Sequence, residues 1–161
     1  MMKILNENDF IVSKTDLKGR ITYCNKIFMD MAEYTEKELL GQPHNIIRHP
    51  DMPKAVFKYL WDNIKNKKEV FAYVINKTKN FNDYWVFTNV TASLDVNGSL
   101  IGYYSVRRKA NPKAINIIEP LYKKMLEVEK TKGIDASFKV LTDILKKKGV
   151  AYDEFILSIQ K

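Results

Sequence analysis

The first part of the chain shows a strand-like pattern that gives way to a helical one. β-Branched residues in 10–16 and alternating apolar and polar residues in 20–24 predict two strands, joined by a turn at 17–19. Asn25 is a suitable N-cap, and the apolar residues after it recur at the spacing of one helix face: Ile27, Phe28, Met31 and Tyr34. A second, short helix is expected to begin at Thr35, which opens a capping-box pattern.

The middle of the chain predicts one longer helix and three longer strands. Residues 54–68 place a row of apolar side chains along one helix face: Val56, Phe57, Leu60, Trp61 and Ile64. Strand-like runs follow at 70–78, 84–94 and 100–108, and the last two are joined through Asn97-Gly98, a strong hairpin signal. This order predicts an α+β fold with a five-stranded antiparallel sheet and helices packed on one face. A ligand has room between the helices and the sheet.

The C-terminal part returns to a helical period. Two amphipathic helices are expected after residue 112, interrupted at Gly133, with Pro120 kinking the first of them and a short third helix over 153–159. We divide the chain into an N-terminal cap (1–9), a central domain (10–110) and a C-terminal helical extension (111–161). The apolar faces of the extension can form a dimer contact, pack on the sheet or dock a receptor, and we favour a homodimer.

The composition indicates a soluble protein with enough apolar material for a packed core. Hydrophobic residues make up 45% of the chain and charged residues 29%. No stretch approaches the roughly 18 continuous apolar residues of a membrane-spanning helix, and the first ten residues do not resemble a signal peptide. The single cysteine, Cys24, cannot form an internal disulfide, which favours a reducing cytoplasm.

The net charge of +8 does not by itself indicate nucleic-acid binding. Lysines are scattered along the chain and interleaved with acidic residues, and 146–148 is the one tight basic run. A second basic string, 107–109, ends a predicted strand. Solvated faces with some preference for an acidic partner explain this pattern, so we expect no nucleic-acid partner.

Residues 42–53 form the most unusual stretch. They hold both histidines of the chain, an arginine, an aspartate and three of the five prolines, which predicts a compact irregular loop. Arg48 and His49 precede a predicted helix N-terminus, and an arginine fork and exposed helix amides both suit a phosphate. Asp51 would repel a phosphate, so we expect it to orient its neighbours or to cap the helix. The same loop can also be read as an element that only shapes the fold.

The string His44 to Pro53, together with Tyr84-Trp85-Val86 and the order of elements, resembles the PAS domain of the bacterial aerotaxis transducers over about residues 13–126. Arg-His-Pro-Asp-Met-Pro is its most restrictive part. The resemblance implies a PAS fold that binds FAD without a covalent bond and senses redox or respiratory state. Since the transducers' membrane, HAMP and kinase-coupling segments are absent from this sequence, the chain is similar to stand-alone PAS sensors. Such sensors signal to a separate membrane-bound receptor of the methyl-accepting chemotaxis type.

A flavin requires an apolar slot for its ring, hydrogen bonds for its pyrimidine edge and cations for its phosphates. Aromatic side chains suited to the slot are Phe57, Trp61, Phe71 and Trp85. Asparagines carry both a donor and an acceptor and can match the ring edge, and the candidates are Asn25, Asn76 and Asn89. The resemblance assigns FAD binding to Arg48, His49 and Asp51. Plain core or strand-end roles are the alternative for each, and Tyr84 and Trp85 alternate, so only one of them can face a pocket.

Several alternatives are left open or disfavoured by the sequence. Where the aerotaxis family tends to have a tryptophan, this chain has Phe71, and because Cys24 lies on a predicted strand, no photochemical thiol adduct is expected. A haem-binding gas sensor with His44 or His49 as axial ligand and a ligand-free interaction module are the competing interpretations. We expect no enzyme, since no nucleophile–base pair, metal triad or phosphate-cradling glycine loop is present.

Overall fold

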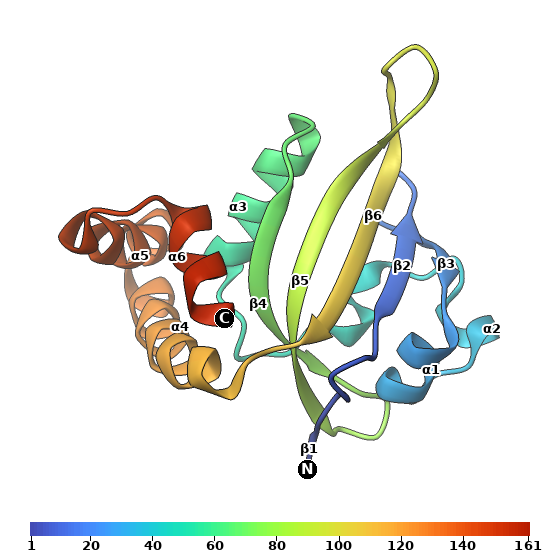
Figure 1. Cartoon of the computed structure of the whole chain (residues 1–161), viewed down its shortest axis with the longest axis horizontal. Coiled ribbons are helices and arrows are strands. Elements are labelled where there is room, and N and C mark those ends of the chain that lie inside the picture. The colour runs from blue at the N-terminus through green and yellow to red at the C-terminus, as the bar shows by residue number, and fades with distance from the viewer.

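A six-stranded sheet runs through the centre of the protein in the computed structural model, which describes residues 1–161 (Figure 1). The strands are β1 (Met2–Lys3), β2 (Ile11–Thr15), β3 (Ile21–Cys24), β4 (Val70–Lys77), β5 (Asp83–Leu94) and β6 (Leu100–Lys109). Strands β4, β5, β6, β2 and β3 lie side by side and antiparallel, as predicted. Strand β1 was not expected; it pairs with the start of β5 in parallel, with Met2 opposite Asp83.

Three of the four helices between β3 and β4 begin where the sequence predicts, whereas the 3₁₀ helix at His44–Ile47 lies in the stretch expected to be irregular. The four are α1 (Lys26–Ala32), α2 (Glu36–Leu39), the 3₁₀ helix η1 (His44–Ile47) and α3 (Lys54–Lys65). The Asn25 side chain accepts the Phe28 N–H and caps α1, and Thr35 forms the predicted capping box with Glu38. Helix α1 ends earlier than expected because Glu33 takes a left-handed conformation, with φ of 63°.

The alternation of side chains gives the sheet two faces with different coverings. We call the face packed against α1, η1 and α3 the inner face, and its side chains include Val74, Asn76, Thr88, Val90 and Arg107. The opposite, outer face carries Phe71, Tyr73, Trp85 and Phe87, and aromatic pairs join its strands, with the Tyr73 and Phe87 rings 5.3 Å apart.

The C-terminal extension packs on the β4 side of the sheet, which is one of the three possibilities that the sequence left open (Figure 1). It consists of α4 (Pro112–Lys132), α5 (Ile134–Lys148) and α6 (Tyr152–Gln160), and α4 continues through Pro120. The Tyr122 hydroxyl donates to the Tyr73 carbonyl at 2.7 Å, and the Tyr152 hydroxyl donates to the Phe71 carbonyl at 2.8 Å. These bonds cover the free edge of β4. The homodimer stays a prediction.

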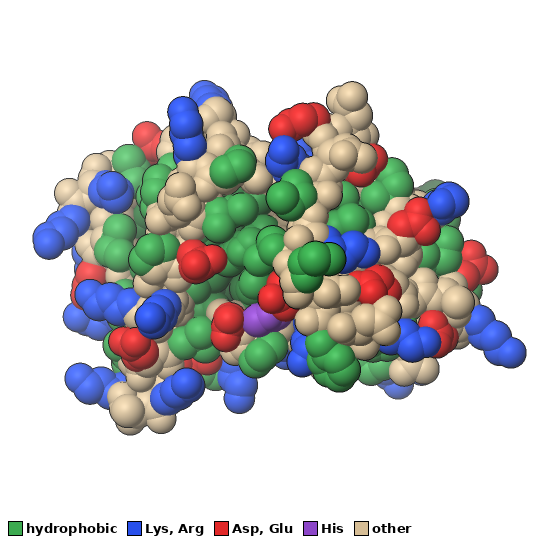
Figure 2. All heavy atoms as spheres, turned by 90° about the horizontal axis from the view of Figure 1, so that it is seen from below, with side chains coloured by type: hydrophobic (Ala, Val, Ile, Leu, Met, Phe, Trp, Pro, Cys, Tyr) green, Lys and Arg blue, Asp and Glu red, His purple; other side chains and the backbone are tan.

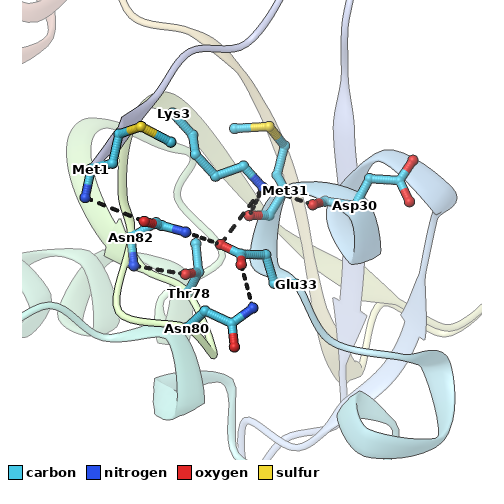
Figure 3. Close-up of polar contacts among 8 residues, drawn as sticks. All are labelled: Met1, Lys3, Asp30, Met31, Glu33, Thr78, Asn80 and Asn82. Carbon is cyan, nitrogen blue, oxygen red and sulfur yellow. Dashed lines mark hydrogen bonds and ion pairs between the residues drawn. The ribbon is translucent and has the colours of Figure 1, made fainter.

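The N-terminal cap is held by a polar network where α1 meets the β4–β5 turn (Figure 3). The Lys3 ammonium donates to two carbonyls at the end of α1, at 2.9 and 3.0 Å. Glu33 accepts from the side-chain amides of Asn80 and Asn82, and the Met1 ammonium donates to Asn82. The segment before β2 is therefore part of the folded domain.

Candidate ligand-binding site

A cavity of about 260 Å³ lies between the inner face, α3 and the η1 loop. Its volume is close to the lower end of the range of roughly 300–1,000 Å³ for small-molecule sites. Helix α3 supplies the apolar wall, since its period puts one row of side chains toward the cavity: Phe57, Leu60, Trp61 and Ile64. The Trp61 ring meets the Tyr103 ring edge-on at 5.2 Å. Gly19 packs beside Trp61 with φ of +80°, a conformation that favours glycine.

Arg107 is the main charge on the floor of the cavity. Its side chain projects from β6, the residue is 2% exposed, and its guanidinium lies 4.6 Å from the centre of the Phe28 ring. Burial lowers the pKa of Arg107 to about 10, so it is charged at neutral pH. Its only side-chain hydrogen bond goes to the Ser13 hydroxyl at 2.6 Å, and no carboxylate pairs with it. A buried cation without a counter-charge costs several kcal/mol, so an acceptor or anion is expected to meet it.

Ser13 links Arg107 to His44. Because the Ser13 hydroxyl oxygen accepts from Arg107, its own proton is free to be donated to His44 Nε2, which lies 3.0 Å away. Burial, and then the positive charge of Arg107, lowers the pKa of His44 to about 3. His44 is thus a neutral acceptor that stacks against Phe28, with ring centres 5.8 Å apart.

Further polar atoms on the inner face have no partner. The buried side-chain atoms without a hydrogen bond include Thr15 Oγ1, Asn76 Nδ2, Thr88 Oγ1 and Arg107 Nε, all from residues that line the cavity. Tyr84 Oη also lacks one by geometry, although it lies close enough to the Asn76 side chain to interact with it. Each such atom costs about 1–3 kcal/mol when it stays unpaired. Their concentration around one cavity is what a ligand with a polar edge would relieve.

The structure brings four of the ten predicted site residues together at this cavity: Arg48, Phe57, Trp61 and Asn76. The Arg48 guanidinium lies 4.1 Å from the centre of the Phe57 ring, and its backbone forms a bridge with that of Asn76. Arg48 and Lys18 line the cavity from loops and are exposed, so the opening of the cavity is cationic.

Three predicted residues lie on the outer face instead. Phe71 stacks on Phe87 at 5.9 Å, and Trp85 lies 6.1 Å from Tyr122 of α4. Asn89 donates to a carboxylate oxygen of the neighbouring Glu69 side chain. The reason is strand alternation: positions 71, 85 and 89 have the opposite parity to the cavity-lining residues of β4 and β5.

The last three predicted residues shape the loops around the site. Asn25 is committed to main-chain groups of β2 and α1. His49 Nδ1 accepts the Asp51 N–H at 3.0 Å, so its Nε2 carries the proton and donates to Asp83 at 2.9 Å. The Asp51 side chain is 74% exposed and does not cap α3, which corrects one of the two roles expected for it. None of the three lines the cavity.

The structure shows neither a metal-binding cluster nor a membrane-spanning helix. No group of three or more His, Cys, Asp or Glu side chains is placed to hold a metal ion. None of the helices combines the length and the apolar composition that crossing a bilayer requires. On the face shown in Figure 2, basic side chains are interleaved with acidic ones around a group of hydrophobic side chains, rather than gathered in one groove.

Comparison with known sequences points to one family. The sequence profile of the PAS fold matches residues 21–107. The aerotaxis receptor of Escherichia coli strain K12 is 41% identical over 119 residues, which are 74% of this chain and 23% of that receptor. The nitrogen fixation regulatory protein of Klebsiella pneumoniae is 25% identical over 97 residues, 60% of this chain and 20% of that protein. The chain thus spans about a fifth to a quarter of the length of these relatives.

Solved structures share the fold at low sequence identity. The light-state structure of the blue-light photoreceptor Aureochrome1 LOV gives a TM-score of 0.59 at 19% identity, over 69% of this chain and 88% of that one. A light-oxygen-voltage domain studied with a flavin analogue gives a TM-score of 0.60 at 17% identity, over 68% and 82% of the two chains. A PAS domain from Colwellia psychrerythraea gives 0.57 at 19% identity, over 62% and 85%.

Proposed function

The chain belongs to the PAS fold family, and from that premise we propose that it is a redox sensor domain that binds FAD non-covalently and signals to a chemoreceptor-type partner. The observation that carries the proposal is the cavity on the inner face. It combines an aromatic wall, a buried arginine without a counter-charge, and several unpaired polar atoms. Similarity to the aerotaxis receptor and to a domain studied with a flavin analogue supports a flavin as the ligand.

The residues present fit the three parts of a flavin cofactor. Phe57 and Trp61 would flank the ring, and Arg107 and Asn76 would meet its polar edge. Arg48 and Lys18, at the exposed opening, would face the phosphates. Bound flavin would supply reversible uptake of electrons.

The protein would detect a change of charge at the polar edge of the flavin ring through Arg107 and Asn76. Arg107 stabilises negative charge next to it, and the Asn76 amide can present either its N–H₂ or its oxygen. A mismatch at a buried group of this kind costs about 1–3 kcal/mol, enough to bias a two-state element.

A haem ligand has less support from the geometry. An axial ligand needs a free imidazole nitrogen, yet His49 uses both of its nitrogens in hydrogen bonds and His44 Nε2 faces Ser13. A ligand-free interaction module would leave Arg107 without a counter-charge and would leave water as the partner of the unpaired atoms of the cavity. We therefore retain the flavin sensor, and with it a receptor partner in trans, a homodimer and a cytoplasmic location, as parts of the proposal. No catalytic turnover is part of it.

The visible absorption spectrum of the freshly purified chain tests the ligand directly. Flavin bands in the blue are expected, and chromatography of the released cofactor should identify FAD rather than FMN. Arg48→Ala should give a folded protein with little or no colour, while Arg108→Ala, whose guanidinium lies near Phe10 and Phe87 on the outer face, should stay yellow. A Soret band, or a protein that binds no added FAD, would overturn the proposal. Unchanged affinity in Arg48→Ala would remove that residue from the site.

A further inference from the structure

The N-terminus of α3 is capped by a residue from α4. Helix α3 starts directly after Pro53, whose side chain offers no acceptor for the first amides. One oxygen of the Glu129 carboxylate accepts the Lys54 N–H at 2.9 Å, and the other accepts the Ala55 N–H at 3.2 Å. The carboxylate also lies at the positive end of the α3 dipole. A side chain 75 residues away in sequence thus supplies what a local N-cap supplies in α1 and α2.

Helix α3 lies between the cavity and the C-terminal helices. The turns that follow the cap carry Phe57 and Trp61, which line the cavity. On its other side, Tyr59 stacks with Phe138 of α5 at 5.5 Å and meets Tyr152 of α6 at 4.5 Å. If α3 moves relative to the cavity, the contacts of Tyr59 transmit that movement directly to α5 and α6.

Glu129 accepts the hydrogen bonds that join the first turn of α3 to α4, and water cannot easily take its place at Ala55. Ala55 is 1% exposed, so its N–H would lose its partner inside the protein if Glu129 moved away. Hydrogen bonds depend steeply on distance and angle, whereas apolar contacts tolerate small slides. The cap is thus a contact between α3 and α4 that depends directly on the position of the first turn of α3.

We propose that Glu129 is a positioning residue that couples the ligand cavity to the C-terminal helical unit α4–α6. When the ligand changes its contacts with the cavity wall, the first turn of α3 shifts, the geometry of the cap changes, and the stability of α4–α6 changes with it. As far as the ligand is a flavin, this inference rests on the proposed function. The coupling itself depends on the contacts of α3 with the extension and not on the identity of the ligand.

Hydrogen exchange of the full chain, measured by mass spectrometry or NMR, tests the cap. In Glu129→Ala, protection of the Lys54 and Ala55 amides should fall about 5- to 30-fold, as for loss of a helix cap. Glu129→Gln keeps a carbonyl acceptor and should give an intermediate loss. Glu127→Ala makes the same change of charge on the same helix at an exposed position without a hydrogen-bonded side chain, and should leave these amides unchanged.

The coupling is tested by protection in α5 and α6, compared between protein loaded with oxidised FAD and the same protein after chemical reduction. A difference between the two states is expected in the wild-type chain and in Glu127→Ala. It should be lost in Glu129→Ala and reduced in Glu129→Gln, and the reduction in Glu129→Gln is the test if the alanine variant folds poorly. An equal difference with and without Glu129 would overturn the inference while leaving flavin binding intact.

A second arm needs no flavin and separates the two proposals. In the apo protein, Trp61→Ala and Glu129→Ala should affect protection of α5 and α6 non-additively, by at least threefold in a double-mutant cycle. Additive effects would overturn the coupling. If the chain binds no FAD, the proposed function fails, and this cycle still decides the inference about Glu129.

Discussion

The two faces of the same strands use polar groups in different ways. On the outer face, the hydroxyl groups of Tyr73, Tyr122 and Tyr152 each donate to a main-chain carbonyl, and the C-terminal helices pack over them. On the inner face, Asn76, Thr88 and Arg107 retain unpaired atoms around a cavity. Satisfied polar groups fix the extension in place, whereas the unsatisfied ones surround the cavity that we propose as the ligand site.

An unpaired atom alone does not identify a site. The Trp85 indole N–H on the outer face is buried and unpaired as well, but Trp85 does not line this cavity. What distinguishes the inner face is that several such atoms converge on one space with a buried cation among them. The four predictions below test this distinction, from the largest expected effect to the smallest.

Replacing Arg107 should have the largest effect, with opposite signs for binding and stability. Arg107→Met should weaken FAD binding by about 2–5 kcal/mol, roughly 30- to 4,000-fold, because a buried charged contact is lost. Without ligand, the same change should raise the free energy of unfolding by about 1–4 kcal/mol, since a buried uncompensated charge is removed. Fluorescence titration with FAD and urea unfolding of the apo protein measure the two effects.

Arg108→Met is the control on the outer face, where the same substitution should change FAD affinity by less than a factor of about two. If Arg107→Met destabilised the apo protein and bound FAD normally, Arg107 would be a structural residue. The inner face would then not be distinguished from the outer face as a ligand site.

The fold should lose stability at low pH mainly through His44, which lines the cavity on the inner face. His44 has its pKa lowered to about 3 in the folded chain, against about 6.5 when unfolded. Between these values the unfolded state binds the extra proton, so the free energy of unfolding falls as pH is lowered through this range. From pH 7 to pH 5 the loss should be about 2 kcal/mol.

The outer-face tyrosines cannot contribute there, because burial raises the pKa of Tyr73 and Tyr122 and keeps both neutral. Urea unfolding at pH 5, 6 and 7 measures the slope, and His44→Gln should flatten most of it. A slope that survives this substitution would place the acid-sensitive group elsewhere.

On the outer face, Tyr122→Phe should destabilise the fold without altering the ligand site. The Tyr73 carbonyl would lose its donor at a buried position, which costs about 1–2 kcal/mol in the free energy of unfolding. FAD affinity should stay within about twofold. Tyr23→Phe, at a residue 46% exposed, is the matched control and should change neither quantity. A larger effect on affinity than on stability would mean that the two faces are coupled through Tyr122.

The sequence predicted most of the fold because local patterns decide it. Asn25 and Thr35 act on amides within three residues, and Asn97-Gly98 turns the chain between neighbouring strands, with φ of 78° at Gly98. Strand β1 could not be predicted in this way. It has two residues, no alternation, and a partner about eighty positions away.

The site was predicted only in part, because strand alternation gives two sets of residues without saying which set faces inward. Phe57 and Trp61 followed from the helix period and line the cavity, whereas Phe71, Trp85 and Asn89 were candidates that the structure places on the other side of the sheet. Arg107 was read as part of a basic string at the end of a strand. The sequence did contain a clue: Arg107 stands at every second position after Tyr103 and Ser105, so all three side chains lie on the same, inward-facing side of β6.

The smallest expected effect compares two asparagines on paired strands. Asn76→Ala should weaken FAD binding by about 1 kcal/mol, roughly fivefold, since its unpaired Nδ2 lies on the cavity. Asn89→Ala removes an exposed hydrogen bond to Glu69 on the outer face and should leave affinity unchanged. FAD titrations of both variants, with urea unfolding as a check on the fold, measure the difference. Were Asn89→Ala to cost more affinity than Asn76→Ala, the ligand would lie against the other side of the sheet, and the unpaired atoms of the inner face would need a different explanation.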